Sequence, residues 1–258
     1  MRHVYRLIFG GILMLFAQFG YSQTIDTIPY YTKINSVFAN VNTSTITTGC
    51  LRDYGIDFLN LDNYTGTAVN DSNFVGLIEW RNLYASIYSE QINSNANLLY
   101  LDTLNKVFNN YAAPSLPISF TTLYFTYQYL DSNAVTNHLM TVTNNQIFDV
   151  AGRTQSPYDK EDLFAIAPIR QSVNIGTNQL EFPSALFFGN SAKTISTIQV
   201  DPLGTGTYQT ATVNTPFNVT YDTAGFYNIN HCCPDKSGFK NLRSVIGKGY
   251  RLKSVVTN

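Results

Sequence analysis

The chain has 258 residues, and its 16 Lys and Arg against 17 Asp and Glu give a formal net charge of −1. This balance excludes the strong positive charge with which proteins attract nucleic acids or anionic membrane surfaces. Charged residues make up only 13% of the chain and aromatic residues 14%, which is opposite to the composition of disordered chains and favours a β-rich exported protein. The length suffices for one large domain or two small ones.

The first 22 residues have the three-part pattern of a secretory signal peptide. Arg2 and Arg6 precede an apolar run over residues 7–17, and the small residues Gly20 and Ser22 follow it. The run is short for a membrane span, which needs about 20 residues. We therefore expect cleavage after Ser22 and a protein that is secreted or at the cell surface, or else periplasmic, with no membrane span in the mature chain. An uncleaved N-terminal anchor is the alternative.

Residues 23 to about 111 are expected to be helical or irregular. The segment 73–92 places apolar residues at three- and four-residue steps, which predicts an amphipathic helix with Asp71 or Ser72 as its N-cap. The expected apolar face is Phe74, Leu77, Ile78, Tyr84, Tyr88 and Ile92. A second helix is predicted over residues 98–108. Trp80 could belong to a platform that stacks on sugars, but its place in the amphipathic pattern favours core packing.

At Ala113 the pattern changes to that of a strand. After two prolines, aromatic and β-branched residues alternate through Phe120, Leu123, Phe125, Tyr127 and Tyr129. Further along, the segment from Pro157 to Asp162 is expected to begin a short helix that ends before Pro168. Its acidic residues are Asp159, Glu161 and Asp162. They suggest a calcium or acid/base site, but solvated acids in a first helical turn are the favoured interpretation.

From residue 173 onward short strands alternate with turn signals. Strands are predicted at residues 173–175, 179–182, 184–188, 194–200, 208–213, 217–221 and 226–229. Such a series predicts an antiparallel sandwich, in which Phe217, Val219 and Tyr221 share one face. The expected fold is therefore mainly β with a helical N-terminal part. Its expected domains are a signal peptide (1–22), a helical or mixed region (23–172) and a β-sandwich (173–258).

The segment Tyr221-Asp-Thr-Ala-Gly-Phe-Tyr-Asn-Ile229 resembles the closing Tyr-x-x-x-Gly-x-Tyr-x-Val segment of PKD-like domains, which are immunoglobulin-like sandwiches. The resemblance implies that Tyr221 and Gly225 flank a turn between two late strands. It also implies that the module is non-catalytic and extracellular and belongs to an exported bacterial protein. Gly225 is free to take a positive φ, and the hydroxyls of Tyr221 and Tyr227 can cap the turn. The earlier Gly-Asp-Gly turn of the family corresponds only to Val200–Gly206, where the second acid is missing.

The sequence contains three cysteines, Cys50, Cys232 and Cys233. In an oxidising compartment Cys50 could pair with either of the other two, and free or buried thiols are an equally good hypothesis. A bond between the adjacent Cys232 and Cys233 is strained and uncommon. Zinc is not expected, because His231 has no second ligand pair at the usual spacing.

No common catalytic motif is present in the sequence, and Ser237–Lys240 matches Ser-x-x-Lys only by spacing. We therefore expect a non-catalytic spacer or recognition module without a cofactor, whose partner is an extracellular protein or polysaccharide. One alternative is an exported hydrolase, either with a scattered site around His138 or His231 or with catalytic residues beyond Asn258, in which case this chain is the N-terminal part of a larger protein. A second alternative is a glycan-binding module, for which Tyr124, Tyr127 and Tyr129 are the candidate stacking rings.

Overall fold

The structure, a computed structural model, describes residues 30–55, 76–170, 172–190, 195, 197–232 and 250–253. The chain divides into two compact units, Met1–Ser36 and Val37–Asn258. The expected signal peptide and its cleavage site lie outside the described residues, and the first described helix is α2 (Tyr30–Val37). In the part of the chain that the structure describes, no helix combines the length and apolar character needed to cross a membrane.

The second unit is mainly β with helices, as the composition predicted. Its α-helices are α3 (Leu77–Ser89) and α4 (Leu101–Asn109), and its 3-10 helices are η1 (Thr43–Thr45), η3 (Ser94–Ala96) and η4 (Ser184–Leu186). The strands are β1 (Ile118–Leu130), β2 (Met140–Thr143), β3 (Gln146–Asp149), β4 (Tyr158–Pro168), β5 (Gly176–Glu181), β6 (Phe187–Phe188), β7 (Thr197–Asp201), β8 (Gln209–Thr212), β9 (Phe217–Tyr221), β10 (Phe226–Cys232) and β11 (Tyr250–Lys253).

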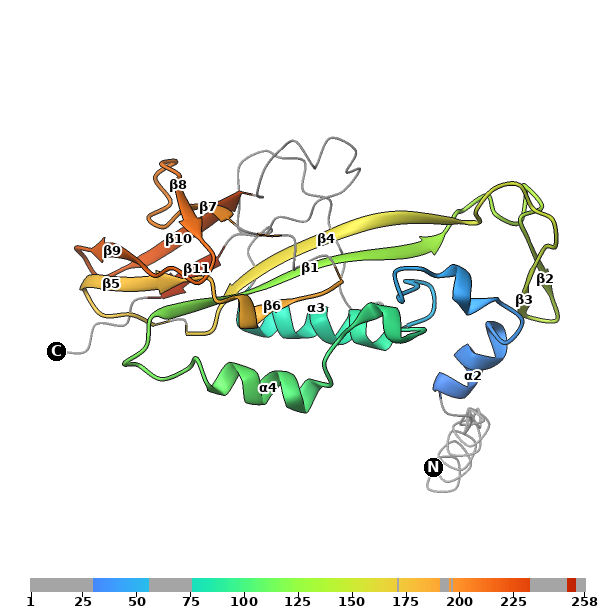
Figure 1. The fold of residues 1–258 in the computed structure, drawn as a ribbon, viewed down its shortest axis with the longest axis horizontal. Coiled ribbons are helices and arrows are strands. Elements are labelled where there is room, and N and C mark those ends of the chain that lie inside the picture. The colour runs from blue at the N-terminus through green and yellow to red at the C-terminus, as the bar shows by residue number, and fades with distance from the viewer. Residues whose placement is uncertain are drawn as a thin grey trace, which may run out of the picture. The chain divides into compact units, whose positions relative to one another are not determined.

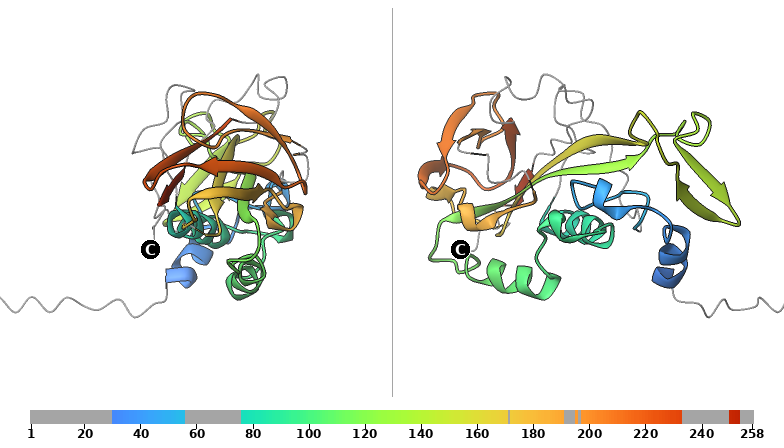
Figure 2. Two further views of the ribbon diagram at one scale, coloured as in Figure 1. Left: turned by 90° about the vertical axis from the view of Figure 1, so that its left-hand side faces the viewer. Right: turned by 45° about the vertical axis from the view of Figure 1, so that its right-hand side comes forward.

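These strands form two larger sheets and a hairpin (Figure 1). The first sheet has the order β4-β1-β5-β9, with β6 also pairing with β1. The second, drawn in orange and red in Figure 2, has the order β11-β10-β7-β8. The hairpin β2–β3 forms its own small sheet. All pairings are antiparallel except those of β1 with β5 and β6.

The long strand β1 organises the first sheet and confirms the strand predicted after Ala113. Its residues from Phe120 to Leu130 pair antiparallel with β4. The helix predicted from Pro157 is wrong, because the same residues form β4 instead. The local helix-start signals are overridden by the continuous ladder with β1 and by the burial of the apolar second half of β4.

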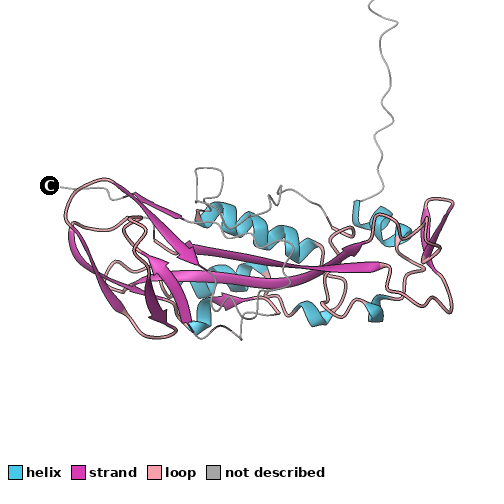
Figure 3. Cartoon of the chain, turned by 90° about the horizontal axis from the view of Figure 1, so that it is seen from above, coloured by secondary structure: helices cyan, strands magenta, loops and turns pink. Residues whose placement is uncertain are grey.

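Helix α3 confirms the predicted amphipathic helix and lies against β4 (Figure 3). It begins at Leu77 after the N-cap Gly76, so the predicted caps are wrong; Asp71 and Ser72 lie outside the described residues. The full burial of Trp80 confirms the core packing expected for it, whereas Ile78, a member of the predicted apolar face, is 66% exposed. The Trp80 indole Nε1 donates to the carbonyl oxygen of Ala165 in β4 at 3.3 Å, which fixes the orientation of its ring.

The second predicted helix is confirmed by α4, whose Leu104 and Phe108 are buried. Both helices contribute to one hydrophobic core cluster that also includes Val219 of β9 and Ile229 of β10. The core therefore contains residues from both sides of position 172. The predicted domain boundary at that position stays a prediction.

The strand series after residue 173 is confirmed in most places. Residues 173–175 are not a strand, because the extended segment begins only at Gly176, which has a φ of 105°. Residues 184–188 form the 3-10 helix η4 followed by the two-residue strand β6. In β9 the predicted alternation is confirmed: Val219 and Tyr221 are buried, while Asn218 and Thr220 are exposed.

The turn between β9 and β10 connects the two larger sheets. The rings of Tyr221 and Tyr227 contact each other across it, with centroids 4.6 Å apart. The Tyr227 hydroxyl donates to the Thr223 carbonyl oxygen at 2.8 Å and so caps the turn. Gly225 does not use the positive φ that is available to glycine.

The β2–β3 hairpin was not predicted. Its two turn residues, Asn144 and Asn145, both have positive φ angles (51° and 60°), as a type I′ turn requires. Asparagine tolerates this conformation better than other side chains. The Asn-Asn pair between two short β-prone segments is the sequence signal that would have identified the hairpin.

Candidate functional site

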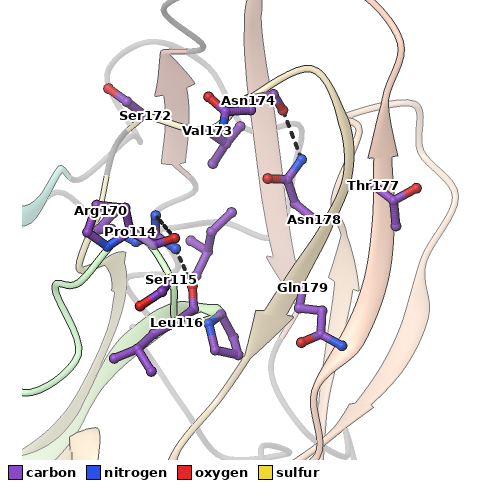
Figure 4. Close-up of a pocket in the computed structure, with 12 residues that line it drawn as sticks. Pro114, Ser115, Leu116, Arg170, Ser172, Val173, Asn174, Thr177, Asn178 and Gln179 are labelled. Atoms are coloured by element: carbon purple, nitrogen blue, oxygen red, sulfur yellow. Dashed lines mark hydrogen bonds between the residues drawn. The ribbon is translucent and has the colours of Figure 1, made fainter.

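The larger of the two described pockets opens where β1 and β5 diverge, and its volume is about 610 Å³ (Figure 4). The two strands pair only at Ile118 with Leu180 and at Ser119 with Glu181. Pro117, directly before β1, has no backbone N–H to continue this ladder. The segment leading into β1 therefore separates from β5, and the space between them is the pocket.

Arg170, two residues after β4, is the only ionisable side chain among the described residues that line this pocket. Its Nη1 and Nη2 donate to the carbonyl oxygens of Pro114 and Leu116 at 3.3 and 2.5 Å, as the dashed lines in Figure 4 show. Its Nε is buried without a hydrogen-bond partner. Burial lowers the pKa of Arg170, and no carboxylate offsets this effect. The guanidinium remains a cation, because its ordinary pKa lies above 12.

The opposite wall of the pocket belongs to β5 and the loop before it. The Asn178 side-chain Nδ2 donates to the carbonyl oxygens of Asn174 and Gly176, both at 2.9 Å, and so holds the loop in place. Thr177 and Gln179 are exposed along the same strand. The pocket thus combines one cation with hydroxyl and amide groups, an arrangement that suits the binding of an anionic, polar ligand.

A second pocket of about 420 Å³ includes Asp201, the acid of the expected PKD-like turn. Asp201 is fully buried, and its carboxylate accepts hydrogen bonds from the backbone N–H groups of Thr205 and Gly206 at 3.1 and 2.7 Å. The carboxylate therefore stabilises the β7–β8 turn. The described residues contain no group of three His, Cys, Asp or Glu side chains that could hold a metal ion.

The acids of the predicted cluster lie along β4. The Tyr127 hydroxyl donates to Glu161 at 2.7 Å, and the Thr126 hydroxyl donates to Asp162. Asp159 is exposed. Glu161 and Asp162 are therefore engaged by hydroxyl groups of β1, and the first helical turn in which all three acids were expected is absent.

The two histidines of the expected mature chain lie in different settings. His231 of β10 packs its ring against Phe120 and Phe182, with centroids 5.3 and 5.7 Å away. Burial lowers the pKa of His231 to about 3, although nearby Asp201 acts in the opposite direction. His138 is exposed, with a positive φ of 55°. At neutral pH His231 is therefore uncharged and a weak base.

The three tyrosines proposed for glycan stacking belong to β1. Tyr127 is buried, and burial, together with its hydrogen bond to Glu161, raises its pKa. Tyr124 and Tyr129 are half-buried. The rings of Tyr127 and Tyr129 are tilted by 50°, so these two do not form a flat platform. Tyr124 and Tyr129 are an odd number of residues apart in β1, so their side chains point to opposite faces of the sheet. Any stacking surface here would depend on one of them alone.

Cys50 is a free and fully buried thiol in the structure. It lies in a segment that bridges α3 and β1: Leu51 N donates to Glu90 O at 3.1 Å, and Gln128 N donates to Cys50 O at 3.0 Å. The Cys50 thiol donates to the Ile87 carbonyl at 3.7 Å and lies 3.8 Å from a Glu90 carboxylate oxygen. Burial and the nearby Glu90 raise the pKa of Cys50 well above its ordinary value. The disulfide stays a prediction, because Cys233 and the Cys232 side chain lie outside the described residues.

We expect Cys50 to resist alkylation in the folded protein at pH 8 and to react fully after denaturation without a reductant. Folding raises the pKa of the Cys50 thiol, so its contribution to the free energy of unfolding is fully present below the unfolded pKa of about 8.5. This contribution decreases as the pH rises from that value through the folded pKa. Peptide mass mapping after iodoacetamide treatment measures the labelling at this residue. A requirement for reductant would instead demonstrate a disulfide at Cys50.

The sequence contained only partial signals for the larger pocket. Pro114 and Pro117 were recognised as marking a change of structure, and Pro168 as an end signal, but Arg170 was not selected. Its role depends on the pairing of β4 with Phe120–Leu130 of β1, which places Arg170, two residues after Pro168, beside the segment before β1. Such a long-range pairing cannot be read from local periodicity.

Comparison of the chain with protein-family models, curated proteins and solved structures found no match.

Proposed function

We propose that this chain is an exported, non-catalytic recognition module of the cell surface or extracellular space, and that its β sheets form a PKD-like, immunoglobulin-like sandwich. The sandwich is supported by ring contacts between the two larger sheets. Phe120 and Phe182, in β1 and just after β5, contact His231 of β10, and Tyr221 of β9 contacts Tyr227 of β10. The position of the β9–β10 turn also agrees with the family resemblance.

The observation that carries the recognition function is the composition of the pocket between β1 and β5. Its described lining offers a cation, side-chain amides and hydroxyls, which are groups that hold and orient a ligand. A hydrolytic site would in addition need a base whose pKa is near the working pH. The low pKa of His231 and its aromatic surroundings favour a structural role for this histidine instead.

Glycan binding through Tyr124 or Tyr129, which lie on opposite faces of β1, is a second candidate, favoured by their partial exposure.

The proposed function is tested on protein expressed in bacteria from the full chain with its leader. We expect most of the protein outside the cytoplasm, with the intact mass of a chain whose first residue is Gln23. We also expect that this protein does not turn over ester, peptide or glycoside substrates. Turnover that is lost on a single substitution would contradict the proposal, as would retention of the full-length protein in the cytoplasm.

A further inference from the structure

We propose that the pocket between β1 and β5 binds the C-terminal carboxylate of an extended peptide, with Arg170 holding the carboxylate and the edge of β5 pairing with the peptide backbone. This inference rests on the proposed recognition function and specifies its ligand. It is supported by two separate features of the pocket, its charge and its open strand edge.

The charge of the pocket is not balanced by the described residues around it. Arg170 forms no ion pair with a described residue, and its hydrogen bonds to described residues go to two neutral carbonyl groups. A guanidinium has five N–H donors, so donors remain on the two Nη atoms after these bonds. Arginine binds carboxylates through two parallel hydrogen bonds, which are stronger in a partly buried site than in water. A ligand carboxylate would therefore neutralise Arg170, the one cation among the described residues that line this pocket.

Among the described residues, no strand pairs with residues 176–179 of β5 on the side of β1, because β1 begins too late to cover them. Residues from Gly176 to Gln179 pair with β9 on one side, whereas β1 reaches only Leu180 and Glu181 on the other. At about 3.3 Å per residue, these four residues present roughly 13 Å of strand edge. An added peptide strand gains affinity from main-chain hydrogen bonds at such an edge.

A peptide fits this pocket better than a saccharide does. No aromatic ring is among the described residues that line it, so a sugar face finds nothing on which to stack. The apolar side chains of Leu116 and Ile175 are instead 38% and 48% exposed, on the pocket wall and directly beside it in sequence. They offer contacts for the side chains of a bound peptide.

The test compares two pools of random hexapeptides, one with free C-terminal carboxylates and one with C-terminal amides. Equilibrium dialysis with mass-spectrometric detection measures how much of each pool the mature protein retains. We expect the carboxylate pool to be retained at least about tenfold more strongly, as a charge-assisted bidentate contact allows. Equal retention of both pools, or retention of neither, would overturn the inference.

Three variants connect the result to the pocket. Arg170→Gln removes the cation, and Ser115→Asp adds a carboxylate on the pocket wall; each is expected to abolish the preference for the free carboxylate. Thr141→Asp adds the same charge on the exposed β2–β3 hairpin and is expected to bind as the wild type does. Thermal unfolding verifies that each variant is folded. If Arg170→Gln fails to fold, Ser115→Asp alone tests the inference. An unchanged preference for the free carboxylate in the folded pocket variants would overturn the inference.

A hexameric oligouronate, which carries carboxylates on a saccharide, is dialysed in parallel. Retention of this saccharide but not of the peptides, in an Arg170-dependent manner, would overturn the peptide assignment. Cleavage of retained peptides would contradict the non-catalytic function while leaving the pocket assignment in place. If the protein binds an extracellular polymer and neither Arg170→Gln nor Ser115→Asp changes this binding, the recognition function would be supported. The assignment of the binding site to the pocket between β1 and β5 would then be overturned.

Discussion

Trp80→Ala is expected to lower the free energy of unfolding by roughly 3–5 kcal/mol. Trp80 is fully buried between α3 and the first sheet, and its ring contacts those of Tyr84, Phe108 and Phe188 with centroids 5.4 to 5.7 Å away. Alanine would leave a large cavity among these rings. It would also leave the carbonyl oxygen of Ala165 without its indole donor, which adds a desolvation cost.

Urea denaturation followed by circular dichroism measures this change, because Trp80 is the only tryptophan and the variant has no indole fluorescence. Ile78→Ala is the matched control in the same helix. Ile78 is 66% exposed, so its replacement should change the stability by no more than about 0.5 kcal/mol. Equal effects of the two substitutions would mean that the buried face of α3 is not the one described.

Gly189→Ala is expected to destabilise the protein by roughly 3 kcal/mol or more. Gly189 follows β6 and has a φ of 108°, a conformation that L-residues rarely adopt. A Cβ atom at this position would lie 2.2 Å from the backbone oxygen of Tyr124. The next residue, Asn190, accepts a hydrogen bond from Thr126 N at 2.8 Å and donates to Thr126 O at 2.8 Å. Displacement of Gly189 would therefore also disturb the contact of Asn190 with β1.

Gly225→Ala is the matched control for this effect. Gly225 has no positive φ, and nothing lies within 4 Å of the position that its Cβ would occupy. We expect a change of less than about 1 kcal/mol, because alanine also reduces the entropy of the unfolded chain. Thermal unfolding of both variants compares them. A large loss for Gly225→Ala, or a small one for Gly189→Ala, would contradict the described backbone.

The sequence was informative where local patterns agree with the tertiary structure. The alternation of β1 and β9 and the periodicity of α3 and α4 all predicted elements that the structure confirms. At residues 158–162 the local signals indicated a helix, yet pairing with β1 produces a strand. Tertiary pairing decides such short, charged segments, because their intrinsic preferences differ by only a fraction of a kcal/mol per residue.

The candidate site was less predictable than the fold. The family resemblance indicates Gly225 as a structural glycine. The structure instead requires glycine at Gly189 and Gly49, which have positive φ angles and lie against the backbone of a distant segment. Arg170 is one arginine among sixteen basic residues until β4 places it beside Pro114 and Leu116. Both features depend on contacts between residues far apart in sequence, which one sequence does not reveal.

The most direct measurement is amide chemical-shift mapping of the ¹⁵N-labelled mature protein, titrated with one retained hexapeptide that has a free C-terminal carboxylate. We predict saturable shifts of the amide signals of Thr177, Asn178 and Gln179 in β5 and of Ser115, Leu116 and Ile118. Arg170→Gln is expected to remove these shifts. Shifts confined to another surface, such as β4 or the β2–β3 hairpin, would contradict a recognition site between β1 and β5.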